Sequence, residues 1–184
     1  MNQSLESHIS HMAGPLSGVS TTEVEDDGFD EELTRRRKHV IRTSWQALRF
    51  GLNVEASKVF YDRLFDQYPM VRPMFRDDMQ AQYNKLYQAV SMAVKCLEDM
   101  DSFRPSLEKL GIAHSSYGVV RAHYEAVTEC FVWTLISYIL VQMPNNNAVN
   151  WMFELSDAWE WILNTIGGIM ADAADETRGR LRTT

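Results

Sequence analysis

Apolar residues recur at helical spacing over the first patterned part of the chain. From Thr34, a residue type that often caps a helix, the stretch 34–48 repeats apolar positions at intervals of three and four residues. A second such stretch covers 53–67 and stops before Pro69, because the residue before a proline disfavours the helical region. The predicted inner faces contain Val40, Ile41, Ser44, Trp45, Leu48, Val54, Ser57, Tyr61, Leu64 and Phe65.

The same periodicity predicts further helices along the rest of the chain. A short turn around Pro69 and Pro73 ends at Phe75 and leads to helices expected at 78–98 and 106–115. Two long helices follow at 119–142 and 148–174, separated by a proline and three asparagines at 144–147. No stretch alternates apolar and polar residues in the manner of a strand, so the pattern predicts an all-α fold.

The first 33 residues differ from the rest of the chain. They are rich in Ser, Gly, Thr and acidic residues, and they show no sustained apolar period. They hold eight acidic and no basic side chains, whereas residues 34–184 hold 17 acidic and 18 basic ones. We therefore expect a disordered acidic extension at 1–33, a helical domain at 34–175 and a short basic tail at 176–184.

Charge and composition narrow the class of protein. A net charge of -7 does not favour a nucleic-acid partner. The longest nearly apolar run, 131–143, is shorter than the roughly 20 residues that cross a bilayer. The N-terminus lacks the pattern of a signal peptide, and Cys96 and Cys130 lie within apolar helical patterns, as buried reduced thiols do. These features predict a cytoplasmic protein without a membrane span.

Four polar residues fall on the apolar faces of four separate predicted helices: Tyr61, Gln82, His114 and Tyr124. No phosphate-binding loop, paired Cys-x-x-Cys or His-Glu-x-x-His zinc motif accompanies them. Each of the four alone is more often a core residue with a local hydrogen bond than a ligand. Together they call for a common cause, and a bound cofactor supplies one.

The sequence around these residues carries recognisable motifs. They are FYDRLF at 60–65, YPMVRPMF at 68–75, and LGIAH at 110–114 with Tyr124 ten residues after His114. In these motifs, and over about residues 35–174, the chain resembles the globin family, especially bacterial single-domain haemoglobins and the globin domains of flavohaemoglobins. The resemblance implies a globin fold of about six or seven helices around a haem pocket. The short interval between Phe75 and Gln82 implies that the D helix is absent.

The resemblance also implies roles for individual residues. His114 matches the proximal histidine, which would bind the iron of haem b and leave the ferrous iron pentacoordinate. Phe75 would pack on the porphyrin, and Tyr61 and Gln82 match a distal pair that donates hydrogen bonds to O2. Leu86, one turn after Gln82, would form an apolar distal wall. The residues implied to contact the cofactor are Phe75, Gln82, Leu86, His114 and Tyr124, and those implied to contact O2 are Tyr61, Gln82 and Leu86.

The chain departs from the family pattern in two ways. In the family, a glutamate near the end of the last helix forms a hydrogen bond with the tyrosine that Tyr124 matches. In this chain Ala174 stands at the position of that glutamate, and Asp172 or Asp175 are alternative partners. Flavohaemoglobins also contain flavin- and nicotinamide-binding domains, which these 184 residues lack. A nitric-oxide dioxygenase reaction would therefore need a separate reductase.

Three functions stay open at this point. The first is reversible binding of O2, CO and NO for oxygen storage, scavenging or transport, as a binding protein rather than an enzyme. The second is a nitric-oxide dioxygenase served by a separate reductase, and the third is a haem-based gas sensor that acts through a partner. A homodimer is also considered, because the last helices carry many large aromatic residues that would either face a second copy or fill the core. They are Trp133, Trp151, Phe153, Trp159 and Trp161.

Overall fold

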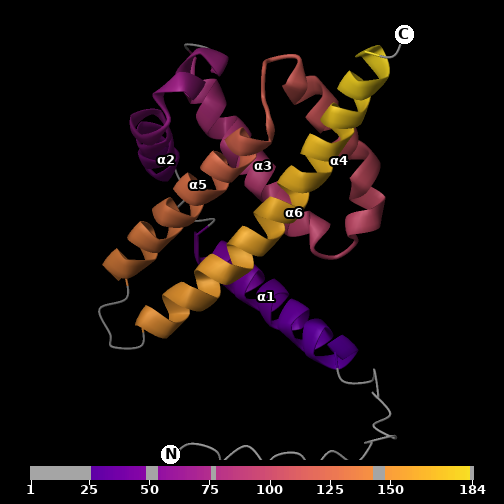
Figure 1. The fold of residues 1–184 in the computed structure, drawn as a ribbon. Coiled ribbons are helices and arrows are strands. Elements are labelled where there is room, and N and C mark those ends of the chain that lie inside the picture. The colour runs from indigo at the N-terminus through magenta and orange to yellow at the C-terminus, as the bar shows by residue number, and fades with distance from the viewer. Residues whose placement is uncertain (1–25, 49–53, 76–77, 143–147, 183–184) are drawn as a thin grey trace, which may run out of the picture. The chain divides into compact units, whose positions relative to one another are not determined.

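The computed structural model describes residues 26–48, 54–75, 78–142 and 148–182. The chain divides into two units, Met1–Glu32 and Leu33–Thr184, and of the first only residues 26–32 are described. All regular structure in the described ranges is helical, which confirms the predicted all-α class (Figure 1). The elements are α1 (Asp26–Leu48), α2 (Val54–Gln67), the 3-10 helix η1 (Pro69–Met74), α3 (Met79–Cys96), α4 (Met100–Ser115), α5 (Arg121–Gln142) and α6 (Ala148–Arg182).

Helix α6 organises the packing of the second unit. It packs against α4 and α5, while α2 packs against α3, α5 and η1. Figure 1 shows α6 as one long helix that runs past α5 and α4. The buried indole of Trp159 donates its Nε1 hydrogen to Ser44 Oγ on α1 at 3.0 Å, and Arg37 on α1 pairs with Asp157 on α6 at 2.8 Å. These contacts hold the part of α1 that belongs to the second unit against α6.

The buried apolar residues form two clusters. The larger one joins α1, α2, η1, α3, α5 and α6 and includes Leu64 and Trp159, which are fully buried. The smaller one packs Leu107 of α4 against Ile169 and Met170 of α6. Helix α4 therefore rests mainly on the C-terminal half of α6, and Met100 and Ile166 pack against both clusters.

Glycines allow α4 and α5 to approach α6 closely. A Cβ added at Gly111 on α4 would lie 2.1 Å from the carbonyl oxygen of Met170 on α6, a distance that no side chain tolerates. A Cβ added at Gly167 on α6 would lie 3.0 Å from Cβ of Tyr124 on α5. The seam between α4 and α6 thus depends on the absence of a side chain at Gly111.

Two helices begin earlier than the sequence predicted. Helix α1 starts at Asp26 instead of Thr34. Residues 26–33 are therefore helical, while the rest of the expected extension, 1–25, lies outside the described residues. Helix α4 starts six residues before the predicted 106, because Asp99 caps it by accepting a hydrogen bond from the Ser102 amide at 3.1 Å. Pro105 is accommodated inside this helix.

The last helix is longer than predicted, and the third follows η1 directly. Helix α6 continues past the expected end near 174 to Arg182, and its extension carries an ion pair between Arg178 and Asp175 at 2.6 Å. Part of the expected basic tail is thus helical. Only four residues, 75–78, separate η1 from α3, about one helical turn. This interval leaves no room for a D helix of ordinary length.

The large aromatic residues of the last two helices divide between the core and the surface. Trp159 is fully buried, whereas Phe153 is 72% exposed. Trp133 is also exposed, and the guanidinium of Arg63 lies 4.2 Å from its ring centroid. The homodimer stays a prediction, and the exposed Phe153 and Trp133 are the positions that would face a second copy.

Two further expectations concern cysteine chemistry and membranes. Cys96 and Cys130 are buried free thiols, as the sequence predicted. Among the described helices, none is both long enough and apolar enough to cross a bilayer.

Candidate functional site

Tyr61 on α2 and Gln82 on α3 lie together where the two helices pack on each other. Tyr61 is 5% exposed, and its hydroxyl donates a hydrogen bond to the backbone carbonyl of Gln82 at 3.2 Å. Gln82 occupies the first turns of α3, which Asp78 caps by accepting a hydrogen bond from the Ala81 amide. The Gln82 side chain is buried, and its amide has no hydrogen-bond partner among the described residues. The pair therefore places one phenol and one uncommitted amide in the same buried region.

Aromatic rings enclose the Tyr61 phenol. The Phe75 ring, which follows η1, lies 5.4 Å from the Tyr61 ring in an edge-on arrangement, and Phe65 lies 5.3 Å from Phe75. Tyr83, next to Gln82 on α3, approaches Tyr61 at 5.8 Å. This aromatic cluster of Tyr61, Phe65, Phe75 and Tyr83 forms because α2, η1 and the start of α3 pack on one another.

Burial changes the acidity of Tyr61. Loss of solvent raises the pKa of its phenol to about 12, with a smaller contribution from Tyr83. Because the neutral form is favoured, the hydroxyl keeps its proton at every physiological pH and stays a hydrogen-bond donor.

His114 lies in the last turn of α4, with one ring nitrogen held by the backbone. Its Nδ1 lies 2.9 Å from the carbonyl oxygen of Leu110, one turn earlier. A carbonyl only accepts hydrogen bonds, so Nδ1 carries the hydrogen and the lone pair of the neutral ring resides on Nε2. Apolar side chains near His114 along the chain are exposed, namely those of Leu110, Tyr117 and Val120. The histidine thus lies in a segment whose apolar side chains are only partly covered by protein atoms.

Tyr124 lies beside His114 at the start of α5. The ring centroids of the two residues are 6.3 Å apart. The Tyr124 hydroxyl is buried, has no hydrogen-bond partner in the described structure, and burial raises its pKa. An orphaned buried hydroxyl costs free energy unless a ligand or another group satisfies it.

Asp172 and Asp175, the two acidic residues considered as hydrogen-bond partners of Tyr124, form ion pairs with arginines instead. Asp172 accepts a hydrogen bond from Arg121 at 2.6 Å, and Asp175 accepts one from Arg178 at 2.6 Å. Ala174, at the register of the family's glutamate, is buried. Neither aspartate therefore replaces the glutamate in this arrangement.

The predicted residues thus fall into two groups. Tyr61, Phe75 and Gln82 lie in one group with α2 and α3, and Leu86, one turn after Gln82, is half-buried against the same core. His114 and Tyr124 form the other group, on α4 and α5. The structure records no hydrogen bond or ring contact between described residues of the two groups.

Two contributions were missed by the sequence reasoning. Leu110 entered the sequence analysis only as the first residue of the LGIAH motif, yet its carbonyl orients His114, which the four-residue spacing in a helix makes possible. Gly111 drew no attention, although it sets the approach of α4 to α6. A glycine inside an otherwise regular helical pattern was the available signal for a close contact.

The fold and the site define an all-helical protein with an imidazole on one helix and a buried phenol and amide on two others. A family model described as Globin matches residues 58–170, more than half of the chain, and the chain therefore belongs to the globin family. It is accordingly a haem-binding and gas-binding protein.

Individual relatives agree with this assignment. The chain is 24% identical over 151 residues to a flavohemoprotein of Schizosaccharomyces pombe, a match that covers 80% of this chain and 34% of that protein. The chain therefore spans about a third of the length of this relative. Among solved structures, a bacterial globin from Campylobacter jejuni is 24% identical, with a TM-score of 0.57, and the match covers 81% of this chain and 99% of that one. This structural likeness supports the globin fold.

The residues present fit a haem on three observations. The Nε2 lone pair of His114 is a suitable ligand for the haem iron. The uncovered apolar side chains beside it suit the face of a porphyrin. Each of the two groups also contains a polar side chain without a hydrogen-bond partner among the described residues. These are the Tyr124 hydroxyl beside His114 and the Gln82 amide beside Tyr61.

Proposed function

We propose that the protein reversibly binds O2, and also CO and NO, at a haem held by His114, and that it serves oxygen storage, scavenging or transport. When bound, the haem supplies an iron atom with a coordination position for a diatomic gas. The observation that supports this function is the buried pairing of Tyr61 with Gln82, because it gathers two hydrogen-bond donors in an apolar surrounding.

His114 would hold the haem through Nε2. The hydrogen bond from Nδ1 to the Leu110 carbonyl at 2.9 Å keeps the ring in one tautomer and one orientation. Since both nearby aspartates are paired with arginines, His114 has a neutral carbonyl as its partner and not a carboxylate. A neutral partner favours a moderate electron donor, which suits reversible gas binding better than oxidative chemistry.

Tyr61 and Gln82 would stabilise a gas ligand that acquires negative charge. A neutral phenol and an amide N–H are both donors, and hydrogen bonds to a charged acceptor are stronger than neutral ones. The Tyr61 hydroxyl would turn from the Gln82 carbonyl toward the ligand, while the Gln82 amide is already uncommitted. Phe75 and Leu86 would exclude water and so slow oxidation of the iron.

The rate of O2 dissociation from the haem-loaded protein tests the role of Tyr61. A lost hydrogen bond of about 1 to 1.5 kcal/mol corresponds to roughly a fivefold to tenfold faster dissociation in Tyr61→Phe. Tyr83→Phe is the matched control, because it removes a hydroxyl from the same aromatic cluster at a ring 5.8 Å away. Equal dissociation rates in Tyr61→Phe and the unaltered protein would contradict the assignment.

The haem ligand itself is tested separately. His114→Ala should abolish the strong visible absorption of the haem-loaded protein, and added imidazole should restore part of it. His123→Ala, which alters a histidine on α5, should leave the spectrum unchanged. Retention of the spectrum in His114→Ala would refute the proximal assignment.

A second candidate is nitric-oxide dioxygenation with a separate reductase. It is favoured by the match to a flavohemoprotein, of which this chain covers 34%. The two candidates differ in the fate of NO added to the oxygenated protein in the presence of a reductant and a flavin reductase. Sustained NO consumption over many turnovers supports the enzyme, and a single burst equal to the amount of protein supports the binding protein.

A further inference from the structure

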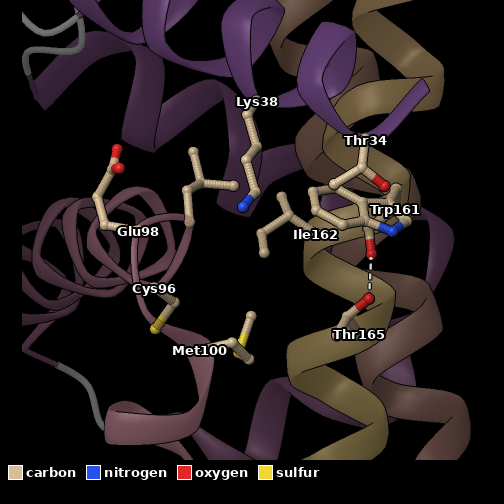
Figure 2. A pocket seen from close by; sticks show the side chains of 9 residues that line it. Thr34, Lys38, Cys96, Glu98, Met100, Trp161, Ile162 and Thr165 are labelled. Atoms are coloured by element: carbon tan, nitrogen blue, oxygen red, sulfur yellow. Dashed lines mark hydrogen bonds between the residues drawn. The ribbon is translucent and has the colours of Figure 1, made fainter. Parts of the chain in front are cut away.

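A small pocket lies between α1, the turn that joins α3 to α4, and α6. It has a volume of about 180 Å³, and all of its lining residues belong to the second unit of the chain. Figure 2 shows Lys38 and Thr34 from α1, Cys96 from the end of α3, Glu98 from the turn that follows it, Met100 from the start of α4, and Trp161, Ile162 and Thr165 from α6. None of the haem-site residues lines it, so the pocket is a separate site.

The floor of this pocket is apolar. Leu97 and Ile162 are buried, and Met100 and Trp161 are partly buried beside them. Cys96 is 1% exposed, and burial raises the pKa of its thiol, so the sulfur is a neutral and weakly polar group. These side chains suit the hydrocarbon part of a ligand.

One cation projects into this apolar space. Figure 2 shows the ammonium group of Lys38 directed into the pocket, toward Ile162 and the α3–α4 turn. Lys38 has no hydrogen-bond or ion-pair partner among the described residues. A charge beside apolar surface is unfavourable unless an opposite charge accompanies it.

The acidic residue at the same pocket does not satisfy Lys38. Glu98 accepts a hydrogen bond from Arg42 Nε at 2.8 Å, and the two form an ion pair outside the apolar floor. The charge of Glu98 is therefore compensated by Arg42, and the pocket retains one net positive charge from Lys38. The Thr34 hydroxyl also lines the pocket, whereas the Thr165 hydroxyl donates its hydrogen to the Trp161 carbonyl at 2.7 Å (Figure 2).

We propose that this pocket binds a small aliphatic carboxylate, whose anionic end pairs with Lys38 and whose chain lies on Met100 and Ile162. A single lysine matches one negative charge, whereas a phosphate dianion would call for more donors than the pocket offers. The volume of about 180 Å³ corresponds to on the order of six water-sized groups at roughly 30 Å³ each, and the bonded heavy atoms of a chain lie closer together than separate waters do. A chain of about six carbons meets both requirements.

Hexanoate is the probe for the test, and the full-length haem-loaded protein saturated with CO is the target. CO occupies the gas site, so an anion cannot bind at the iron. Methyl NMR signals of Met100 and Ile162 should shift saturably as hexanoate is added. Hexanol has the same chain without the charge, and its affinity should be lower than that of hexanoate by about tenfold or more.

Variants at Lys38 locate the charge. Lys38→Gln should weaken hexanoate binding about tenfold or more, and Lys38→Arg should bind hexanoate with nearly the affinity of the unaltered protein. Lys95→Gln is the matched control, since Lys95 is an exposed lysine next to Cys96 that does not line the pocket. It changes the net charge equally and should leave the affinity unchanged.

Several results would overturn the proposal. They are equal binding of hexanol and hexanoate, undiminished binding in Lys38→Gln, an equal loss in Lys95→Gln, and the absence of saturable shifts at Met100 and Ile162. Far-UV circular dichroism of Lys38→Gln verifies that the variant is folded, which is expected because Lys38 makes no hydrogen bond or ion pair with a described residue.

Discussion

A methyl group added at Gly111 tests how the fold positions His114. The new Cβ of Gly111→Ala would lie 2.1 Å from the carbonyl oxygen of Met170 and 2.6 Å from two other backbone atoms of that residue. These atoms belong to the backbone of α6 and cannot rotate away as a side chain would. To reach the 3.0 Å that real contacts require, α4 must move away from α6 by roughly 0.9 Å.

The expected cost follows from two opposing terms. Overpacking at a fixed contact costs about 1 to 3 kcal/mol. Alanine improves the helix propensity at this position by at most about 1 kcal/mol. The free energy of unfolding should therefore fall by about 1 to 2 kcal/mol, and His114, three residues further along α4, should move with the helix.

Gly168→Ala is the matched control for this change. Gly168 lies on α6 with nothing within 4 Å of an added Cβ, so the variant should be stabilised by up to about 1 kcal/mol. Urea unfolding followed by circular dichroism measures both variants, and transfer of haem to an acceptor protein measures the effect on His114. Equal unfolding midpoints and equal haem transfer in Gly111→Ala and Gly168→Ala would refute this account of the seam between α4 and α6.

Three other changes test single groups. Tyr124→Phe removes an orphaned buried hydroxyl and should leave the haem-free protein equally stable or more stable by up to about 1 kcal/mol, whereas a loss measured in urea would mean that the hydroxyl has a partner. Ser44→Ala leaves the buried Nε1 of Trp159 without its acceptor at 3.0 Å and should lower the free energy of unfolding by about 1 to 3 kcal/mol, unlike the control Ser106→Ala, which alters an exposed serine on α4. The phenol of Tyr61 has a folded pKa of about 12 against 10.0 when unfolded, so the unfolded state loses this proton first as the pH rises. Its contribution is constant below pH 10 and declines by about 2.7 kcal/mol toward pH 12, a decline that Tyr61→Phe should lack in urea titrations at each pH.

Helical periodicity predicted the helices well and their ends poorly. The apolar intervals marked each helix, because every long helix in this fold buries one face. The ends depend on local groups that periodicity does not register. Asp99 caps α4 before Pro105, and the ion pair between Arg178 and Asp175 supports α6 beyond 174. A proline or a change in composition was therefore a weaker signal than the cap or the pair.

The sequence named the candidate site residues, but it could not predict the contacts that they make. Spacing placed Tyr61, Gln82 and His114 on apolar faces, and the family resemblance implied their roles. Neither could indicate that the Tyr61 hydroxyl donates to the Gln82 carbonyl, since that bond depends on how α2 packs on α3. The same holds for Gly111, because the backbone atoms that exclude a side chain there belong to Met170 on α6, far along the chain.

The two groups of site residues rest on different parts of the core, and this separation has a measurable consequence. Tyr61 belongs to the larger apolar cluster, whereas α4 and its Gly111 rest on the smaller one with Met170. Changes at sites without shared partners add within about 0.5 kcal/mol, so Tyr61→Phe and Gly111→Ala should be additive in the free energy of unfolding of the haem-free protein. A haem that touches both groups would couple them, and the double variant should then deviate from additivity by more than about 0.5 kcal/mol in the haem-loaded protein. Additivity in both forms would mean that no common group connects Tyr61 to α4, and strong coupling without haem would mean that the two clusters act as one.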